Sequence, residues 1–141
     1  MSSNTPSAIA GVTSEASPYG VDETLQRLEE VIRNRGLTLF AHFDHSGEAA
    51  RVGLSMQPAH VLVFGNPRAG TPLMVASPLI ALDLPLKTLV WQDDGGHVWV
   101  SYNQPTFLAQ RYGISPDLAA VVAGVEGTVE AALHNNATPP Q

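Results

Sequence analysis

The stretch 84-LPLKTLVWQDDGGHVWVSY-102 decides the fold. Two runs rich in β-branched and aromatic residues flank Asp94-Gly95, a dipeptide typical of a two-residue type I′ turn. A hairpin centred on that turn pairs Trp91 with Val98, and it places Trp91 and Trp99 on opposite faces of the sheet. The stretch therefore predicts an antiparallel hairpin inside a larger sheet.

Lys87, the only lysine of the chain, alternates with Leu89 and Trp91 on the more apolar face of this hairpin. A lysine that is desolvated there has a lowered pKa and can act as a nucleophile or base. The alternative is a lysine that reaches the edge of the sheet or pairs with an acid. Lys87 is therefore a candidate ligand-binding and catalytic residue, and a purely structural role is the alternative.

Outside the hairpin, apolar periodicity alternates between helix and strand. Val21, Leu25, Leu28 and Ile32 recur at helical spacing, and Gly36 follows as a stop signal. Further elements are expected at strands 8–17, 37–45 and 60–65, and at helices 47–52, 72–77, 105–112 and 115–133. The pattern predicts an α+β fold: a single two-layer domain, with a mixed sheet of about five strands and helices packed mainly on one face. Residues 8–133 form that domain, and 1–7 and 134–141 are expected to be flexible tails.

Composition restricts the partners. The 141 residues carry a net charge of -6, with 14% charged residues and no cysteine. Scattered arginines without a basic cluster disfavour nucleic acid and anionic membranes. Absence of cysteine excludes disulfides, thiolate nucleophiles and cysteine-ligated metals. With no signal peptide or membrane-spanning run, we expect a soluble cytoplasmic protein whose few charges favour a homodimer.

The stretch 61-VLVFGNPRAGTPLM-74 is similar to a phosphate-binding loop that follows a strand. The lysine that such a loop needs is missing, and Pro72 removes a backbone N–H from the cradle. We expect a structural turn in which Asn66 and Pro67 redirect the chain and Thr71 caps a helix. The free helix N-terminus, with Arg68 beside it, still offers a site for a small anion.

Two sets of histidines are candidates for a site. His45 ends a strand where a cleft often opens, and with Asn66 and Lys87 it can form a polar cluster in an apolar pocket. A hydrogen-bonded structural histidine is the alternative. Separately, His42 and Asp44 share one strand face that His60 can join across the sheet, so the three are candidate metal ligands. No spacing requires a metal, and no cofactor is expected.

Four stretches in this order carry a family resemblance: the helix near VDETLQRLEEVIRNRGL, then FAHFDHSGEAARVG, VLVFGNPRAGTPLM and LDLPLKTLVWQDDGGHVWVSY. The chain resembles the domain of unknown function 302 family over roughly residues 10–114, with the helix at 115–133 largely outside the match. The resemblance implies a compact two-layer α+β domain, typically a homodimer, and assigns no catalytic residue.

Three functions remain open at this point. The first is a homodimeric module that binds a small molecule, with anions among the candidate ligands, near His45, Asn66 and Lys87. The second is an enzyme with His45 as general base and Lys87 as electrostatic stabiliser. The third is an interaction protein without a ligand.

Overall fold

The computed structural model describes residues 6–134, and most of the expected flexible tails lie outside the described residues. Five strands form one sheet in the order β1-β5-β4-β3-β2. The strands are β1 (Val12–Ser17), β2 (Thr38–Asp44), β3 (Ala59–Gly65), β4 (Leu86–Gln92) and β5 (Val98–Asn103). The α+β class is confirmed. Every neighbouring pair is antiparallel, where a mixed sheet was expected.

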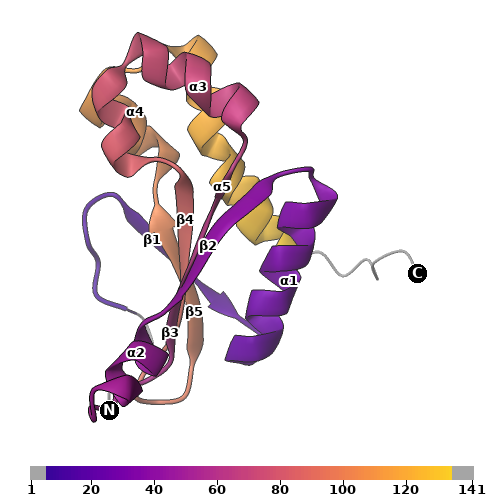
Figure 1. Cartoon of the computed structure of the whole chain (residues 1–141), viewed down its shortest axis with the longest axis vertical. Helices are drawn as coiled ribbons and strands as arrows, with labels where there is room; N and C mark the ends of the chain where they lie inside the picture. The colour runs from indigo at the N-terminus through magenta and orange to yellow at the C-terminus, as the bar shows by residue number, and fades with distance from the viewer. Residues whose placement is uncertain (1–5, 135–141) are drawn as a thin grey trace.

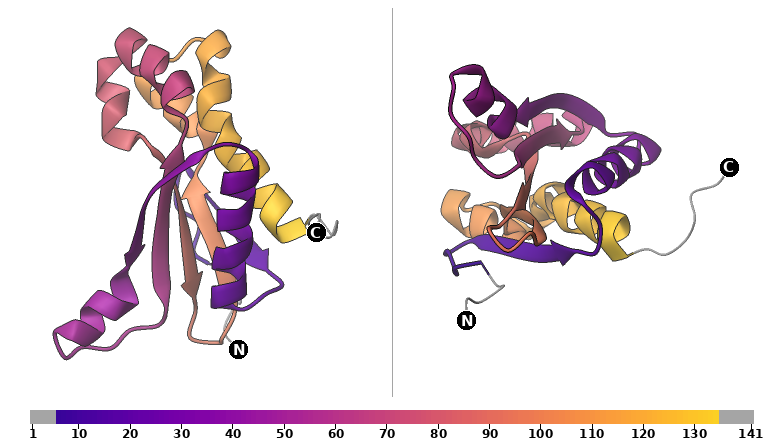
Figure 2. Two further views of the ribbon diagram at one scale, coloured as in Figure 1. Left: turned by 45° about the vertical axis from the view of Figure 1, so that its right-hand side comes forward. Right: turned by 90° about the horizontal axis from the view of Figure 1, so that it is seen from below.

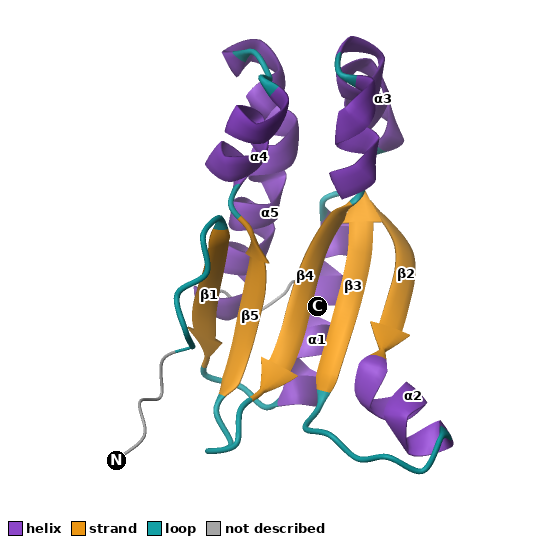
Figure 3. Cartoon of the chain, turned by 90° about the vertical axis from the view of Figure 1, so that its left-hand side faces the viewer, coloured by secondary structure: helices purple, strands orange, loops and turns teal. Residues whose placement is uncertain are grey.

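Two helices, α1 (Val21–Asn34) and α5 (Pro116–His134), cover one face of this sheet. Figure 3 shows both behind the strands, with no described helix in front of them. Alternation along β3 turns Leu62 and Phe64, both fully buried, toward these helices. Each helix packs an apolar stripe at helical spacing against the sheet. These stripes contribute the buried residues Leu25, Leu28, Ile32, Val122, Val125 and Val129. The core therefore lies in a single layer between the sheet and the two helices.

The remaining helices lie at the two ends of the sheet. They are α2 (His45–Arg51), α3 (Pro67–Ala76), the 3₁₀ helix η1 (Pro78–Asp83) and α4 (Pro105–Tyr112). Helices α3 and α4 stand beyond one end, and α2 lies at the opposite end (Figure 1). Helix α2 buries none of its residues, and it projects past the strands as an arm (Figure 2).

The hairpin between β4 and β5 differs from its sequence prediction by one step of register. Trp91 pairs with Trp99, so both tryptophans lie on the same face of the sheet. The connecting loop spans residues 93–97, because Asp93 organises it with its side chain. Asp93 Oδ1 accepts from the backbone N–H groups of Gly95 and His97, and Oδ2 accepts from the Trp99 indole. A longer, side-chain-stabilised loop thus replaces the expected two-residue turn.

A β-bulge interrupts the pairing of β2 with β3. Leu39 pairs with Phe64, whereas Ala41 pairs with Val63, so Phe40 is the extra residue. The bulge leaves the alternation of the second half of the strand intact but reorients its first half. Phe40 is thereby free to turn toward the end of the sheet where α3 begins.

Candidate functional site

A hollow of about 440 Å³ opens at the end of the sheet that carries α3. It lies where the ends of β2, β3 and β4 meet α3 and the first half of α5. Its lining comprises Leu37, Phe40, Gly65, Asn66, Pro67, Ala69, Gly70, Thr71, Met74, Leu84, Pro85, Leu86, Ala120, Val121 and Gly124. We call this hollow the apical pocket.

The turn from β3 into α3 forms the polar rim of the apical pocket. Helix α3 begins at Pro67, with Asn66 as its cap, because Asn66 Oδ1 accepts the backbone N–H of Arg68. The expected cap at Thr71 is therefore wrong by five residues, since the Asn-Pro pair starts the helix earlier. Gly70 lies inside the helix, so the glycine-containing loop that would cradle a phosphate does not exist.

The side wall of the pocket is built from close packing around the end of β3. A Cβ added to Gly65 would lie 3.6 Å from Pro85 Cβ and 3.7 Å from Phe40 Cε2. The bulge in β2 supplies the phenyl ring, and the cis peptide bond between Leu84 and Pro85 lies on the opposite side. Phe40 keeps 48% of its surface exposed, which leaves an apolar ring at the mouth of the pocket.

Helix α5 closes the pocket with its small side chains. Ala120, Val121 and Gly124 face the hollow. A Cβ at Gly124 would come no closer than 3.9 Å to Leu86 Cδ1, an ordinary contact distance. Glycine inside a helix costs about 1 kcal/mol relative to alanine. Since packing does not require a glycine here, its effect is to leave space on the pocket side of the helix.

The chemistry of the lining is neutral. All the lining residues are among those described, and none carries a charged side chain. An anion in such a place would lose its hydration without gaining a cationic partner. The pocket therefore suits an uncharged, largely apolar molecule with a polar group that can reach Asn66 or Thr71.

Lys87 lies outside the apical pocket. Its side chain is exposed, and Nζ donates to the backbone carbonyl of Pro85 at 3.1 Å. It borders a separate, very small hollow of about 10 Å³ together with Asp83 and Asn103. Lys87 is therefore neither desolvated nor at an edge strand: β4 is the central strand, and the ammonium group lies in solvent beside the start of that strand.

His45 lies at the far end of the sheet from Asn66, as the first residue of α2. Asp44 pairs with His60, and Lys87 pairs with Val63. At about 3.3 Å per residue along a strand and 4.8 Å between strands, this register places the backbones of His45 and Lys87 roughly 16 Å apart through space. The expected cluster of His45, Asn66 and Lys87 does not form, because antiparallel β2 and β3 carry His45 and Asn66 to opposite ends.

The three candidate metal ligands do come together at the edge of the sheet. His42 Nε2 lies 2.9 Å from His60 Nδ1, and His60 Nε2 lies 3.7 Å from Asp44 Oδ1. Glu29 of α1 extends the row, with Oε2 3.8 Å from His42 Nδ1. The hydroxyl of Ser46, followed by the backbone N–H of Gly47, lowers the pKa of Asp44. The four side chains form a linear chain of contacts in which each nitrogen faces a different partner.

Comparison with known proteins gives this architecture a family. The family model for "Domain of unknown function DUF302" matches residues 13–135. The chain belongs to the DUF302 family.

A solved DUF302 structure shows the same fold. The crystal structure of an uncharacterized conserved DUF302 protein from Bacillus stearothermophilus superposes with a TM-score of 0.73 at 25% sequence identity. The similarity covers 89% of this chain and 97% of that one. The family match at residues 13–135 includes the whole of α5, so the final helix, expected to lie largely outside the family resemblance, is part of the DUF302 domain.

Curated relatives are longer than this chain. The fluoride-specific ion channel FluC 1 of Brucella suis biovar 1 (strain 1330) is 40% identical over 124 residues, which cover 85% of this chain and 48% of that protein. FluC 1 of Brucella abortus biovar 1 (strain 9-941) has the same identity, with 46% of its length covered. The DUF302 chain thus spans about half the length of these relatives. Within residues 6–134, no helix has the length and apolar character needed to cross a bilayer.

Two features of the DUF302 domain escaped sequence reasoning. The α5 wall of the pocket was read only as an apolar stripe, although Ala120 and Gly124 are small residues one turn apart. A cluster of Glu15, Glu130 and His134 was also missed. Its signal was the four-residue spacing of Glu130 and His134 on one helix face.

Proposed function

We propose that this DUF302 domain is a cytoplasmic, homodimeric module that binds a small, neutral and largely apolar molecule in the apical pocket. The observation that supports this proposal is an uncharged hollow of about 440 Å³ walled by the turn at Asn66, the bulge at Phe40 and the small residues of α5. Pockets for small ligands commonly enclose about 300–1,000 Å³ and combine apolar walls with a few polar groups. The original expectation of an anion is replaced, because no positive group faces the hollow.

The surface supports the homodimer part of the proposal. The sheet face opposite α1 and α5 has no helix over it among the described residues, and it presents Trp91, Leu89 and Phe43. Beyond it, the arm formed by residues 45–58 leaves its large apolar side chains in solvent: Val52 is 72% exposed, Leu54 66% and Met56 50%. Apolar surface of this extent favours association. A second copy related by a two-fold axis can cover both the sheet face and the arm.

The enzyme alternative is less well supported, because its two proposed catalytic residues, His45 and Lys87, lie far apart. A general base and its electrostatic partner must approach a common reacting atom within hydrogen-bonding reach. His45 and Lys87 are separated by roughly 16 Å on the register described above. The apical pocket itself is lined by no histidine, lysine or carboxylate, so binding is the better-supported activity.

A fluorescent probe tests the binding function. Nile red, an uncharged apolar dye, is titrated into the full chain, and compounds are scored by displacement. We expect saturable binding that neutral apolar compounds reverse, while acetate, phosphate and fluoride leave it unchanged. Absence of saturable binding, or displacement by the anions, would refute the neutral pocket.

The curated relatives favour a second candidate, an accessory domain of a membrane transport protein. The Brucella relatives carry the fluoride channel name on chains about twice the matched length. Because this domain has no helix of spanning type in its described part, it would act beside the unmatched half. Fluoride efflux from vesicles that contain a Brucella relative, with and without its DUF302 half, tests the idea. Unchanged efflux would contradict a regulatory role.

A further inference from the structure

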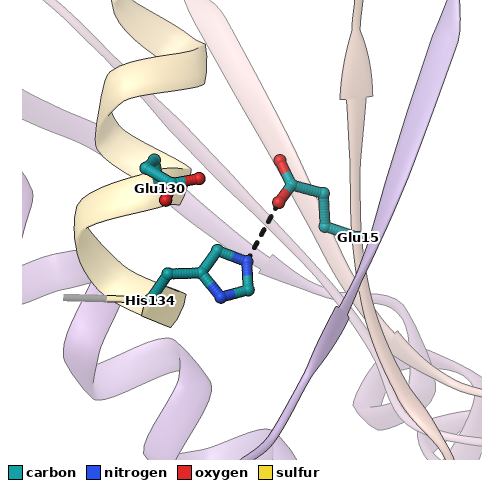
Figure 4. A group of neighbouring side chains, drawn as sticks. All are labelled: Glu15, Glu130 and His134. Carbon is teal, nitrogen blue, oxygen red and sulfur yellow. Dashed lines mark hydrogen bonds and ion pairs between the residues drawn. The ribbon is translucent and has the colours of Figure 1, made fainter. Parts of the chain in front are cut away.

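Three potential metal ligands converge on the helix-covered side of β1. Glu15 extends from that strand, while Glu130 and His134 are one helical turn apart near the end of α5 (Figure 4). One ligand atom from each lies within 4.8 Å of the others. Among residues 6–134, no other set of three His, Asp or Glu side chains brings one ligand atom from each within 4.8 Å of the others. The three come from two elements that the fold holds side by side.

We propose that Glu15, Glu130 and His134 bind a divalent transition-metal ion of the zinc or cobalt type. His134 Nε2 lies 3.2 Å from Glu15 Oε1. Two nitrogen or oxygen ligands in a tetrahedral site, each about 2.0–2.2 Å from the ion, lie about 3.3–3.6 Å apart. The pair is therefore already close to chelating distance, and the side chain of Glu130 needs to turn toward it.

The surroundings hold two parts of the cluster in position. Tyr102, a buried residue that is 6% exposed, donates its hydroxyl hydrogen to Glu15 Oε2 at 3.1 Å. That bond leaves Oε1 directed at His134, which is the orienting role that outer partners have in metal sites. On the other side, Arg27 Nε donates to the carbonyl of Ala132 at 2.7 Å and fixes the last turn of α5.

A simple ion pair explains the cluster less completely. A protonated His134 between two glutamates would offset only one of the two negative charges. Glu130 makes no hydrogen bond or ion pair with any described residue, although its carboxylate approaches that of Glu15. A dication offsets both carboxylates and accepts a neutral imidazole nitrogen, so it accounts for all three side chains.

The row of His42, His60 and Asp44 does not compete as a three-ligand site. Its histidines use opposite ring nitrogens for different neighbours, with His60 Nδ1 facing His42 and Nε2 facing Asp44. One ion cannot accept both nitrogens of one ring. His42 therefore serves as the matched control for His134, since both histidines are partly exposed and each contacts a glutamate.

The test titrates Co²⁺ into the full chain and follows its visible absorption together with calorimetric stoichiometry. We expect one ion per chain, binding weakened at least tenfold by His134→Ala and by Glu130→Gln, and no change in His42→Ala. Zn²⁺ displaces the cobalt, whereas Mg²⁺ and Ca²⁺ do not. Glu130 is exposed, so Glu130→Gln keeps the test valid even if His134→Ala fails to fold.

The proposal is overturned by any of three results. These are no saturable binding at millimolar cobalt, equal affinity in wild type and Glu130→Gln, or loss of binding in His42→Ala alone. The probe differs from the dye used for the apical pocket, so either proposal can fail without the other.

Discussion

Trp91 and Trp99 lie directly opposite each other on β4 and β5, with ring centroids 6.5 Å apart and ring planes inclined by 28°. Each indole N–H has its own acceptor: Ser101 Oγ for Trp91, at 2.9 Å, and Asp93 Oδ2 for Trp99, at 3.0 Å. Stacked aromatic pairs on neighbouring strands stabilise a sheet. The tryptophan pair and Asp93 together fix the register of this hairpin.

The carboxylate of Asp93 makes the stability of the fold depend on pH. The indole of Trp99, followed by the backbone N–H of His97, lowers the pKa of Asp93 below its usual value. A carboxyl whose pKa is lower in the folded state stabilises the fold above the unfolded pKa of about 4, and this effect is lost as pH falls through the folded pKa. We expect Asp93→Asn to lower Tm at pH 7 and the difference from wild type to shrink below pH 4.

Thermal unfolding of both proteins across this pH range provides the measurement. Asp94→Asn, at the neighbouring exposed position, is the matched control and should follow wild type. A gap between Asp93→Asn and wild type that stays constant from pH 7 to pH 3 would contradict the role given to the carboxylate.

The register of the hairpin shows what the sequence could and could not predict. Strand composition and the Asp-Gly pair correctly indicated two antiparallel strands, because these are local preferences. The competing loop depends on one carboxylate reaching three N–H groups, including an indole six residues away. Such side-chain contacts form only once the strands are paired, so a one-step error in register placed Trp99 on the wrong face.

The candidate site was likewise predictable from the sequence only in part. Asn66 and Thr71 were identified from the turn motif and do line the hollow. His45 was placed beside them from strand parity alone, which gives the face of a residue but not the end of the sheet at which it lies. The contribution of α5 could not be foreseen, because the contact between Gly124 and Leu86 joins distant segments.

Thr88 offers a test of the core. It is fully buried on β4, and its hydroxyl has no hydrogen-bond partner among residues 6–134. Because an unpaired buried hydroxyl costs about 1–3 kcal/mol, Thr88→Val should raise the free energy of unfolding by about 1 kcal/mol. Urea unfolding checks this.

Thr128 is the control for that substitution. It is equally buried, but its hydroxyl donates to the Gly124 carbonyl at 2.9 Å. Thr128→Val should therefore bring no comparable gain. If Thr88→Val were destabilising while Thr128→Val was neutral, the hydroxyl of Thr88 would have to be satisfied in solution.

The arm provides a test of the dimer. Leu54 is 66% exposed in the single chain, and a dimer that covers the arm would bury it. Leu54→Glu should then shift the mass measured by light scattering from dimer toward monomer, because an unpaired carboxylate in an apolar interface is strongly unfavourable. Val75→Glu, at a position on α3 that is 77% exposed, should remain dimeric.

Two results would argue against this interface. One is a wild-type chain that is monomeric at every concentration tested. The other is a dimer that withstands Leu54→Glu but dissociates in Val75→Glu, which would move the contact to the opposite end of the sheet.

Gly124 connects stability with ligand binding. Gly124→Ala should stabilise the chain by about 0.5–1 kcal/mol, since alanine favours a helix interior and the added Cβ meets only Leu86 Cδ1 at 3.9 Å. Gly124→Leu should fill the hollow and abolish binding. Gly127→Ala is the control: it lies on the same helix outside the pocket, and its Cβ meets only the flexible end of Arg35. We expect Gly127→Ala to leave binding unchanged.

The most direct test of the neutral apical pocket is a ¹H–¹⁵N NMR titration of wild type and Gly124→Leu with a neutral compound that displaces Nile red. The amides of Gly70, Thr71 and Gly124 should shift in wild type, and the shifts of Gly70 and Thr71 should be lost in Gly124→Leu. Shifts confined to the tryptophan face or the arm, or equal binding by both proteins, would contradict a ligand site at this end of the sheet.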